Sequence, residues 1–178
     1  MSRLPAISRD KLSTENQAIW DRVMSGRSTG GPFGALIHVP RLAERIAAVE
    51  TYFRSEGALA ATDRELVILA TAREMGAHFP WTRHEIRGRE AGLRSDAVEA
   101  LRVNKVLDAL TPRERLLVEM VRSLLREHRL SDELFSRGLA ELGAEQLVET
   151  IALIGHYSLI GSVVNAFGIA APAGSVTF

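Results

Sequence analysis

The sequence predicts an all-α protein, and three observations support that prediction. Apolar residues recur at the three- and four-residue spacing of a helix face. No run shows the alternation of apolar and polar residues that is typical of a half-buried strand. Helix start signals alternate along the chain with glycines that end helices. With 178 residues the chain is long enough for a single domain, residues 1–178, with a sizeable core.

Residues 1–39 are predicted to hold one helix and a loop, and we assign them as an N-terminal extension. Thr14 and Gln17 have capping-box spacing ahead of the helical segment AIWDRVM. Gly26 predicts the end of that helix. The glycines and prolines of RSTGGPFGALIHVP, residues 27–40, predict an ordered loop.

Two further helices are predicted in the next part of the chain. Pro40 suits the first turn of a helix that ends near Gly57. Thr62 and Glu65 form a second capping-box pattern, so the following helix is predicted to begin there and to stop near Gly76.

The middle of the chain continues this pattern. Pro80 is predicted to open a helix that ends near Gly92, and Ser95 is predicted to cap a short helix over DAVEALRV. Thr111 and Glu114, with a first-turn proline between them, make the clearest start signal of all, ahead of a helix to about residue 128.

The C-terminal part is predicted to be helical up to a loose tail, residues 172–178. Ser131 is predicted to cap DELFSRGLAELG, and a strongly apolar helix follows over residues 144–168. This helix carries His156 and Asn165, which are costly in hydrocarbon, so we expect a buried helix and no membrane contact. Because it is apolar on most faces, a neighbouring subunit would cover it best, and a homo-oligomer is expected.

Composition excludes several classes of function. The formal net charge is zero, so the chain lacks the basic field of a nucleic-acid binder. The chain has no cysteine, which excludes disulfides, thiolate metal sites and a thiol nucleophile. No metal-ligand spacing of the HExxH kind and no phosphate-binding loop is present, so neither a metal nor another cofactor is expected. The N-terminus resembles neither a signal nor a transit peptide, and a cytoplasmic location is expected.

An internal repeat with an offset of about fifty residues is visible among these helices. TDRELV at Thr62 matches TPRERL at Thr111, and RGREAGL at Arg87 matches RGLAELG at Arg137. Short capping motifs also recur by chance, so the duplication is one of two interpretations. If the duplication is real, the position equivalent to His84 lies near Leu134, and only the first unit carries the candidate catalytic residues.

The strongest candidate for chemistry is His84, which shares the apolar face of its helix with Trp81 and Gly88. Glu65 lies on the preceding helix, where antiparallel packing would allow the two side chains to meet. A carboxylate that fixes one imidazole nitrogen leaves the other free to exchange a proton near neutral pH. His84 and Glu65 are therefore candidates for a catalytic pair, although helix geometry alone does not establish their contact. A core histidine bonded to a carbonyl, and a glutamate explained by its capping box, are the competing interpretations.

Five further residues are candidate substrate contacts, each with a structural alternative. Trp81 could form a pocket wall or anchor the core. Arg73 and Arg83 could bind a carboxylate or remain solvated. His78 could contact substrate or cap its helix, and His156 could be a site residue or an interface group.

The run DRELVILATAREMGAHFPWTRHEIRGREAGL, residues 63–93, resembles the carboxymuconolactone decarboxylase family, which includes the alkyl hydroperoxidase D proteins. The ending LVETIALIGHYSLIGSVVNAFGI and the GPF loop are similar to that family as well, so the likeness covers about two thirds of the chain. The resemblance implies an alkyl hydroperoxidase D-like helical bundle that forms trimers or hexamers. It places Glu65 and His84 on a proton relay, and Ala77 and Pro80 where the peroxidase branch has its Cys-x-x-Cys pair.

The resemblance therefore implies proton transfer without thiol peroxidase chemistry. The first hypothesis is a cofactor-free lyase or isomerase that acts on a small carboxylated lactone or a related product of aromatic ring cleavage. His84 would donate the proton and Glu65 would orient it. The chain departs from the decarboxylase in a long segment, residues 102–142, and in REAGL, where that enzyme has an asparagine-rich turn. The alternative is a non-catalytic helical oligomer that binds a small molecule or a partner.

Overall fold

A computed structural model describes residues 2–104 and 107–178 of the chain, and the regular elements in those residues are helices. They are two 3-10 turns, Arg9–Lys11 and Leu107–Ala109, and eight α-helices: α1 (Thr14–Met24), α2 (Pro32–Leu36), α3 (Pro40–Ser55), α4 (Ala61–Glu74), α5 (His78–Glu90), α6 (Ser95–Val103), α7 (Pro112–Arg126) and α8 (Asp132–Ala166). The predicted all-α fold class is confirmed.

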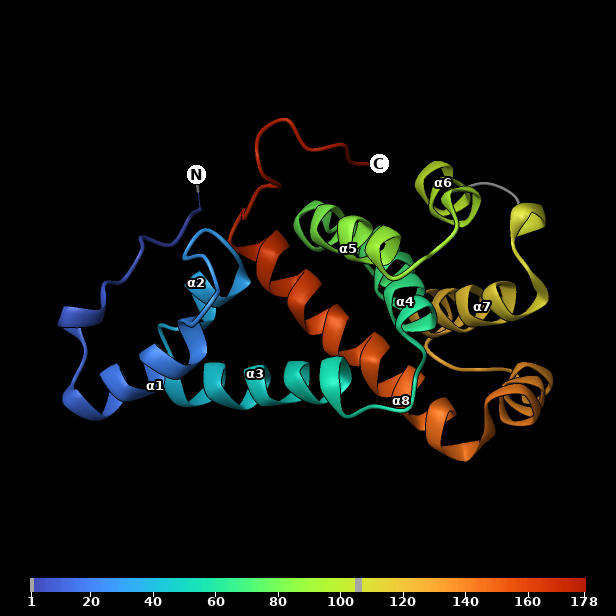
Figure 1. The fold of residues 1–178 in the computed structure, drawn as a ribbon, viewed down its shortest axis with the longest axis horizontal. Coiled ribbons are helices and arrows are strands. Elements are labelled where there is room, and N and C mark those ends of the chain that lie inside the picture. Colours follow the sequence, from blue (N-terminus) through green and yellow to red (C-terminus); the bar gives the residue numbers. More distant parts are fainter. Residues whose placement is uncertain (1, 105–106) are drawn as a thin grey trace.

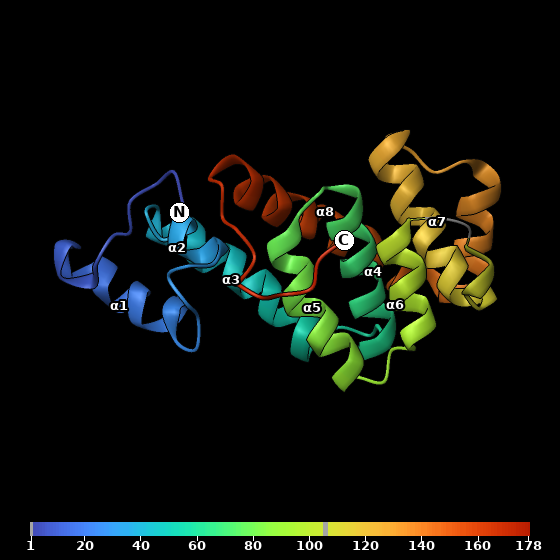
Figure 2. The ribbon, with the colours of Figure 1, turned by 90° about the horizontal axis from the view of Figure 1, so that it is seen from above.

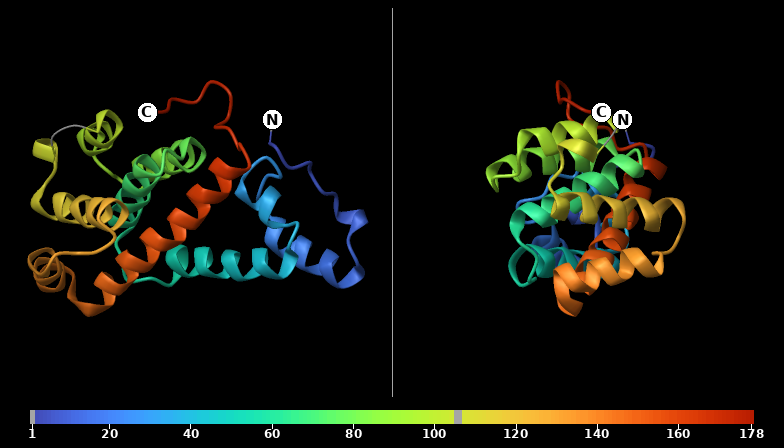
Figure 3. Two further views of the ribbon diagram at one scale, coloured as in Figure 1. Left: turned by 180° about the vertical axis from the view of Figure 1, so that it is seen from behind. Right: turned by 90° about the vertical axis from the view of Figure 1, so that its right-hand side faces the viewer.

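Helix α8 runs diagonally through the molecule and connects its two ends (Figure 1). Helices α1 to α3 lie on one side of it, and α6 and α7 lie at the opposite end from α1 (Figures 1 and 2). The view from behind shows the same order, with α4 and α5 between these groups (Figure 3). Helix α8 bends sharply at Gly143, because this residue has a positive φ of 70°. The apolar part of α8 follows the bend, where the sequence predicts a helix to begin.

The core is centred on α4, which contacts α5, α6, α7 and α8. Four consecutive residues of α4, Leu66 to Leu69, are at most 1% exposed. A helix that is covered on every side has no need of a polar face, which explains the weak amphipathic pattern of this segment. The helix that carries Glu65 is therefore packed on several sides by other helices.

Several predicted helix starts are confirmed. Thr111 and Glu114 form a complete capping box at the start of α7, and Ser131 caps α8 by accepting a hydrogen bond from the Leu134 amide. Pro40 occupies the first turn of α3 as predicted. In each of these cases the local signal agrees with the packing.

Other predicted starts are wrong by one or two residues. Ser13, not Thr14, caps α1, because its hydroxyl accepts from the Asn16 amide. Helix α4 begins at Ala61 with Ala60 as its N-cap, and no side chain caps it. The predicted capping box of Thr62 and Glu65 is absent.

Two further starts differ in the same way, and the predicted loop contains a helix. Ser95 is the first residue of α6 and makes no cap, and α5 begins at His78, two residues before Pro80. The segment predicted as a loop over residues 27–40 contains α2, whose first residue is Pro32. A five-residue helix is too short to show an apolar period, so its pattern was indistinguishable from a loop.

The C-terminal tail is not loose. The Phe178 ring stacks on His78 at 4.4 Å between centroids and meets Trp81 edge-on at 5.0 Å. Arg102 donates a hydrogen bond from Nη1 to the Thr177 carbonyl at 2.7 Å. The prediction failed because these partners lie on α5 and α6, far from the tail in sequence.

Helix α8 is long and apolar enough to span a membrane by length and composition alone, with a mean hydropathy of 1.6 in its best window. Half of that window is buried inside the fold, as expected for the core helix of a folded domain. Val148, Ile151 and Leu159 of α8 remain exposed. They form the surface that the predicted homo-oligomer would cover, and that oligomer stays a prediction.

Candidate functional site

A cavity of about 610 Å³ lies between α3, α5 and α8. The loop before α2 and the segment after α8 complete its walls, and His84 lies in one of them. A smaller cavity of about 280 Å³ reaches the same histidine and is lined by Glu65, Arg64 and Arg87. His84 therefore sits between two spaces that small molecules can enter.

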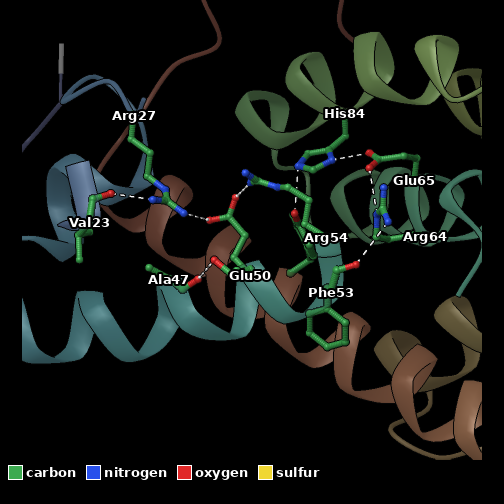
Figure 4. Close-up of polar contacts among 11 residues, drawn as sticks. Val23, Arg27, Ala47, Glu50, Phe53, Arg54, Arg64, Glu65 and His84 are labelled. Atoms are coloured by element: carbon green, nitrogen blue, oxygen red, sulfur yellow. Dashed lines mark hydrogen bonds and ion pairs between the residues drawn. The ribbon is translucent and has the colours of Figure 1, made fainter. Parts of the chain in front are cut away.

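His84 and Glu65 form a buried pair, as the sequence predicts. The imidazole Nδ1 lies 2.6 Å from Glu65 Oε2, and the two residues are 6% and 4% exposed. Figure 4 shows the pair joined across α5 and α4, with Arg64 on the far side of the carboxylate. Gly88, one turn after His84, packs against Leu93, and a Cβ there would lie 3.1 Å from the Leu93 side chain.

Tyr157 of α8 extends the pair toward the larger cavity. Its hydroxyl oxygen lies 3.1 Å from His84 Nε2, and its ring meets the imidazole edge-on at 5.0 Å. Tyr157 is 7% exposed and lines both cavities. The three side chains form a continuous hydrogen-bonded line, Glu65 to His84 to Tyr157, that ends at a ligand-sized space.

The pKa shifts define the resting protonation of this line. Burial alone would raise the pKa of Glu65, but the hydrogen bond from His84 and the charge of Arg64 bring it below its usual value. Burial lowers the pKa of His84 in spite of Glu65, and burial raises the pKa of Tyr157. Near neutral pH, His84 therefore donates its Nδ1 hydrogen to the Glu65 carboxylate, and Tyr157 donates its hydroxyl hydrogen to Nε2.

Arginines give the larger cavity a positive lining. Arg27 and Arg54 both bind Glu50, which they hold at the cavity wall (Figure 4). Arg83 and Arg87, four residues apart on α5, also line the cavity and make no ion pair with any residue that the structure describes, in contrast to Arg89 on the same helix, which binds Glu85. A cationic wall with unpaired guanidinium groups is suited to a carboxylate.

The structure brings two of the five predicted substrate contacts to the cavity. Arg83 and His156 line it, together with the predicted catalytic residue His84. Glu65 reaches only the smaller cavity.

The other three predicted contacts lie elsewhere, with the C-terminal tail. Trp81 is fully buried, and its indole nitrogen donates to Glu85 Oε2 at 3.0 Å. The Arg73 guanidinium lies 4.4 Å from the centroid of the Phe178 ring, and His78 stacks on the same ring. None of the three lines either cavity, and the structure places Trp81, Arg73 and His78 against Phe178 instead.

Sequence reasoning did not consider Arg54 and Glu50, and it did not select Arg87 and Tyr157 among the predicted site residues. The spacing of Arg83 and Arg87 around His84 was a usable signal, because residues four apart share a helix face. Tyr157 comes from a helix 73 positions away in sequence from His84, and no sequence pattern shows that the two side chains meet.

Comparisons with known proteins agree with this geometry. Residues 40–123 match the model of the carboxymuconolactone decarboxylase family, a range that includes Glu65 and His84 and excludes Tyr157. The comparison with curated proteins found no match.

Two solved structures are similar. One is an uncharacterized peroxidase-related protein with an alkylhydroperoxidase AhpD core from Ralstonia eutropha JMP134, at 18% identity and a TM-score of 0.78 over 97% of this chain and 93% of that one. The other is a protein of unknown function from Agrobacterium tumefaciens, at 21% identity and a TM-score of 0.69 over 76% and 94% of the two chains. The resemblance predicted from the sequence is confirmed, and so is the alkyl hydroperoxidase D-like fold.

Proposed function

We propose that this chain, whose residues 40–123 match the carboxymuconolactone decarboxylase family, is a cofactor-free proton-transfer enzyme for a small carboxylated lactone or a related ring-cleavage product. One observation carries the proposal. The buried line of Glu65, His84 and Tyr157 ends at an arginine-lined cavity of about 610 Å³. The chain has no cysteine, so thiol peroxidase chemistry is not part of the proposal.

The resting hydrogen bonds favour removal of a proton from carbon. As a substrate C–H bond breaks, its proton passes to the Tyr157 oxygen while the phenolic proton passes to His84 Nε2. The electron pair of the C–H bond moves into the adjacent carbonyl. The imidazolium that forms is stabilised by the Glu65 carboxylate 2.6 Å from Nδ1.

The same groups can return a proton. Reversal of the transfer at a different carbon completes an isomerisation. In a decarboxylation, the C–C bond breaks as CO2 leaves, its electron pair forms an enolate, and the Tyr157 hydroxyl protonates the carbon. The tyrosinate then recovers a proton from water. In both reactions Tyr157 touches the substrate, and His84 and Glu65 act through it.

The substrate class follows from the lining of the larger cavity. Arg83 and Arg87 provide unpaired guanidinium groups for a carboxylate beside Tyr157. A carboxylate fixed there would present the neighbouring carbon to the phenol. The cavity volume is within the range typical of small-molecule sites.

The test is an NMR assay in D2O with 4-carboxymuconolactone and related carboxylated lactones. We expect turnover or deuterium incorporation by the wild type, and a loss of about 100-fold or more in Tyr157→Phe. Tyr52→Phe is the matched control, because Tyr52 binds Glu149 and lines neither cavity. Folded wild-type protein that shows no turnover or exchange with the whole panel would count against the proposal and favour a binding role.

A further inference from the structure

His156 precedes Tyr157 on α8, and its role is not explained by the proton line. It is 9% exposed and lines the larger cavity. Its imidazole makes no hydrogen bond with any residue in the described part of the chain, whereas every fully enclosed side-chain nitrogen or oxygen there has a partner. The His156 nitrogens have no partner and are therefore not fully enclosed. Because His156 lines the cavity, we take them to be open to it.

Aromatic contacts fix the position of this imidazole. Its ring centroid lies 5.9 Å from that of Phe53 and 5.2 Å from that of Tyr157. The ring is thus packed in the wall without a hydrogen bond to the protein. Because its nitrogens are open to the cavity, they can bond to a molecule that occupies it.

Its surroundings keep His156 neutral. Burial lowers the pKa of His156, the Glu50 carboxylate partly opposes this, and His84 adds to it. The cavity therefore offers two kinds of hydrogen-bond donor, which are the cationic arginines and a neutral imidazole N–H. Arginines match a carboxylate that is charged throughout the reaction. A neutral imidazole can polarise a carbonyl oxygen that becomes negative only in the transition state.

We infer that His156 donates a hydrogen bond to the substrate carbonyl oxygen and stabilises the enolate that forms when Tyr157 takes the proton. This inference rests on the proposed function. The electron pair of the broken C–H bond ends on that oxygen, and His156 keeps its own proton throughout. Tyr157 and His156, with ring centroids 5.2 Å apart, reach the carbon and the oxygen of one ligand from the same wall.

The kinetic test compares His156→Phe with His156→Gln in the D2O assay. Phenylalanine keeps the ring and removes the donor, so kcat is expected to fall about 100-fold with KM within about threefold. Glutamine keeps an N–H donor and is expected to lose about tenfold or less. His78→Gln is the control, since His78 lies outside the cavity and is expected to retain full kcat. A kcat for His156→Phe within twofold of the wild type would overturn the inference.

A binding test separates this inference from the proposed function. Two probes are added to 15N-histidine-labelled protein: paraconate, a saturated carboxylated lactone, and 3-hydroxybenzoate, a carboxylated enolate mimic. We expect the His156 ring nitrogens, assigned from the spectrum of His156→Phe, to shift with both, and that variant to bind 3-hydroxybenzoate about tenfold more weakly. Shifts at His156 without turnover of any lactone would refute the proposed function and support His156 as a ligand contact. Unshifted His156 signals at high probe concentration, or no binding of either probe, would refute the inference.

Discussion

Two helix starts in this molecule share one sequence pattern but use their glutamates in opposite ways. TPRE at the start of α7 forms a capping box, in which the Thr111 amide donates to Glu114 Oε2 at 2.7 Å. TDRE at the start of α4 forms none, and Glu65 instead binds His84 from inside the fold. The shared pattern therefore places one glutamate in a helix cap and the other in a buried pair with a histidine.

The parallel extends to the helices that follow. Gly88 of α5 and Gly138 of α8 are both buried, and each allows a close approach, of Leu93 in the first case and of Leu147 in the second. The residue offset by fifty from His84 is Leu134, which is buried and apolar. Among the described residues, Glu114 binds Arg94 and the Thr111 amide, not an imidazole.

The different outcome follows from packing. Helix α4 begins one residue earlier than its capping signal, at Ala61, which carries Glu65 past the cap position and onto a buried face. There His84 supplies a hydrogen bond that compensates for the loss of solvent. A weak local preference is thus overridden by a stronger tertiary contact.

The largest expected effect distinguishes the two glutamates by activity. Glu65→Gln removes the charge that stabilises a His84 imidazolium, and we expect kcat to fall about 100-fold or more. Glu114→Gln weakens the cap of α7 and the ion pair of Glu114 with Arg94, which line neither cavity, and is expected to keep kcat within about twofold. Both are measured in the D2O exchange assay, with circular dichroism to establish that each variant is folded. Equal kcat values for the two variants would show that Glu65 is no more important for activity than Glu114.

A second prediction concerns the dependence of stability on pH. The folded-state pKa of His84 lies below its usual value of 6.5, so the unfolded chain binds the extra proton in the interval between the two values. Stability is therefore fully present above pH 6.5 and falls as the pH drops toward the folded-state pKa. The slope contributed by one such group is at most about 1.4 kcal/mol per pH unit.

The measurement is urea unfolding at several pH values between 7.5 and about 5. His84→Gln is expected to flatten the pH dependence without abolishing it, because the pKa of His156 is lowered in the same direction. Glu114→Gln is the control. The pKa of Glu114 is lowered from 4.5, so its contribution is lost only at more acidic pH and the slope in this window should not change. An unchanged slope in His84→Gln would show that His84 is not buried in its neutral form.

The sequence predicted the helices wherever local and tertiary preferences agree, as at Pro40, Thr111 and Ser131. It also predicted the pair of Glu65 and His84 through a family resemblance, because helix geometry allowed this contact but did not establish it. It could not predict Tyr157, whose contact with His84 depends on the path of α8 across the fold. For the same reason it misplaced Trp81, since the tail that covers this residue returns from the far end of the chain.

The smallest expected effect tests the caps themselves. Thr111→Ala removes the acceptor of the Glu114 amide hydrogen bond, and the free energy of unfolding is expected to fall by about 1 kcal/mol. Thr62→Ala removes no cap, because α4 begins before it, and a change within about 0.5 kcal/mol is expected. Chemical denaturation at pH 7.5 measures both, and neither variant should alter kcat. If Thr62→Ala were as destabilising as Thr111→Ala, the two starts would be equivalent in solution, and Glu65 would be shared between cap and site.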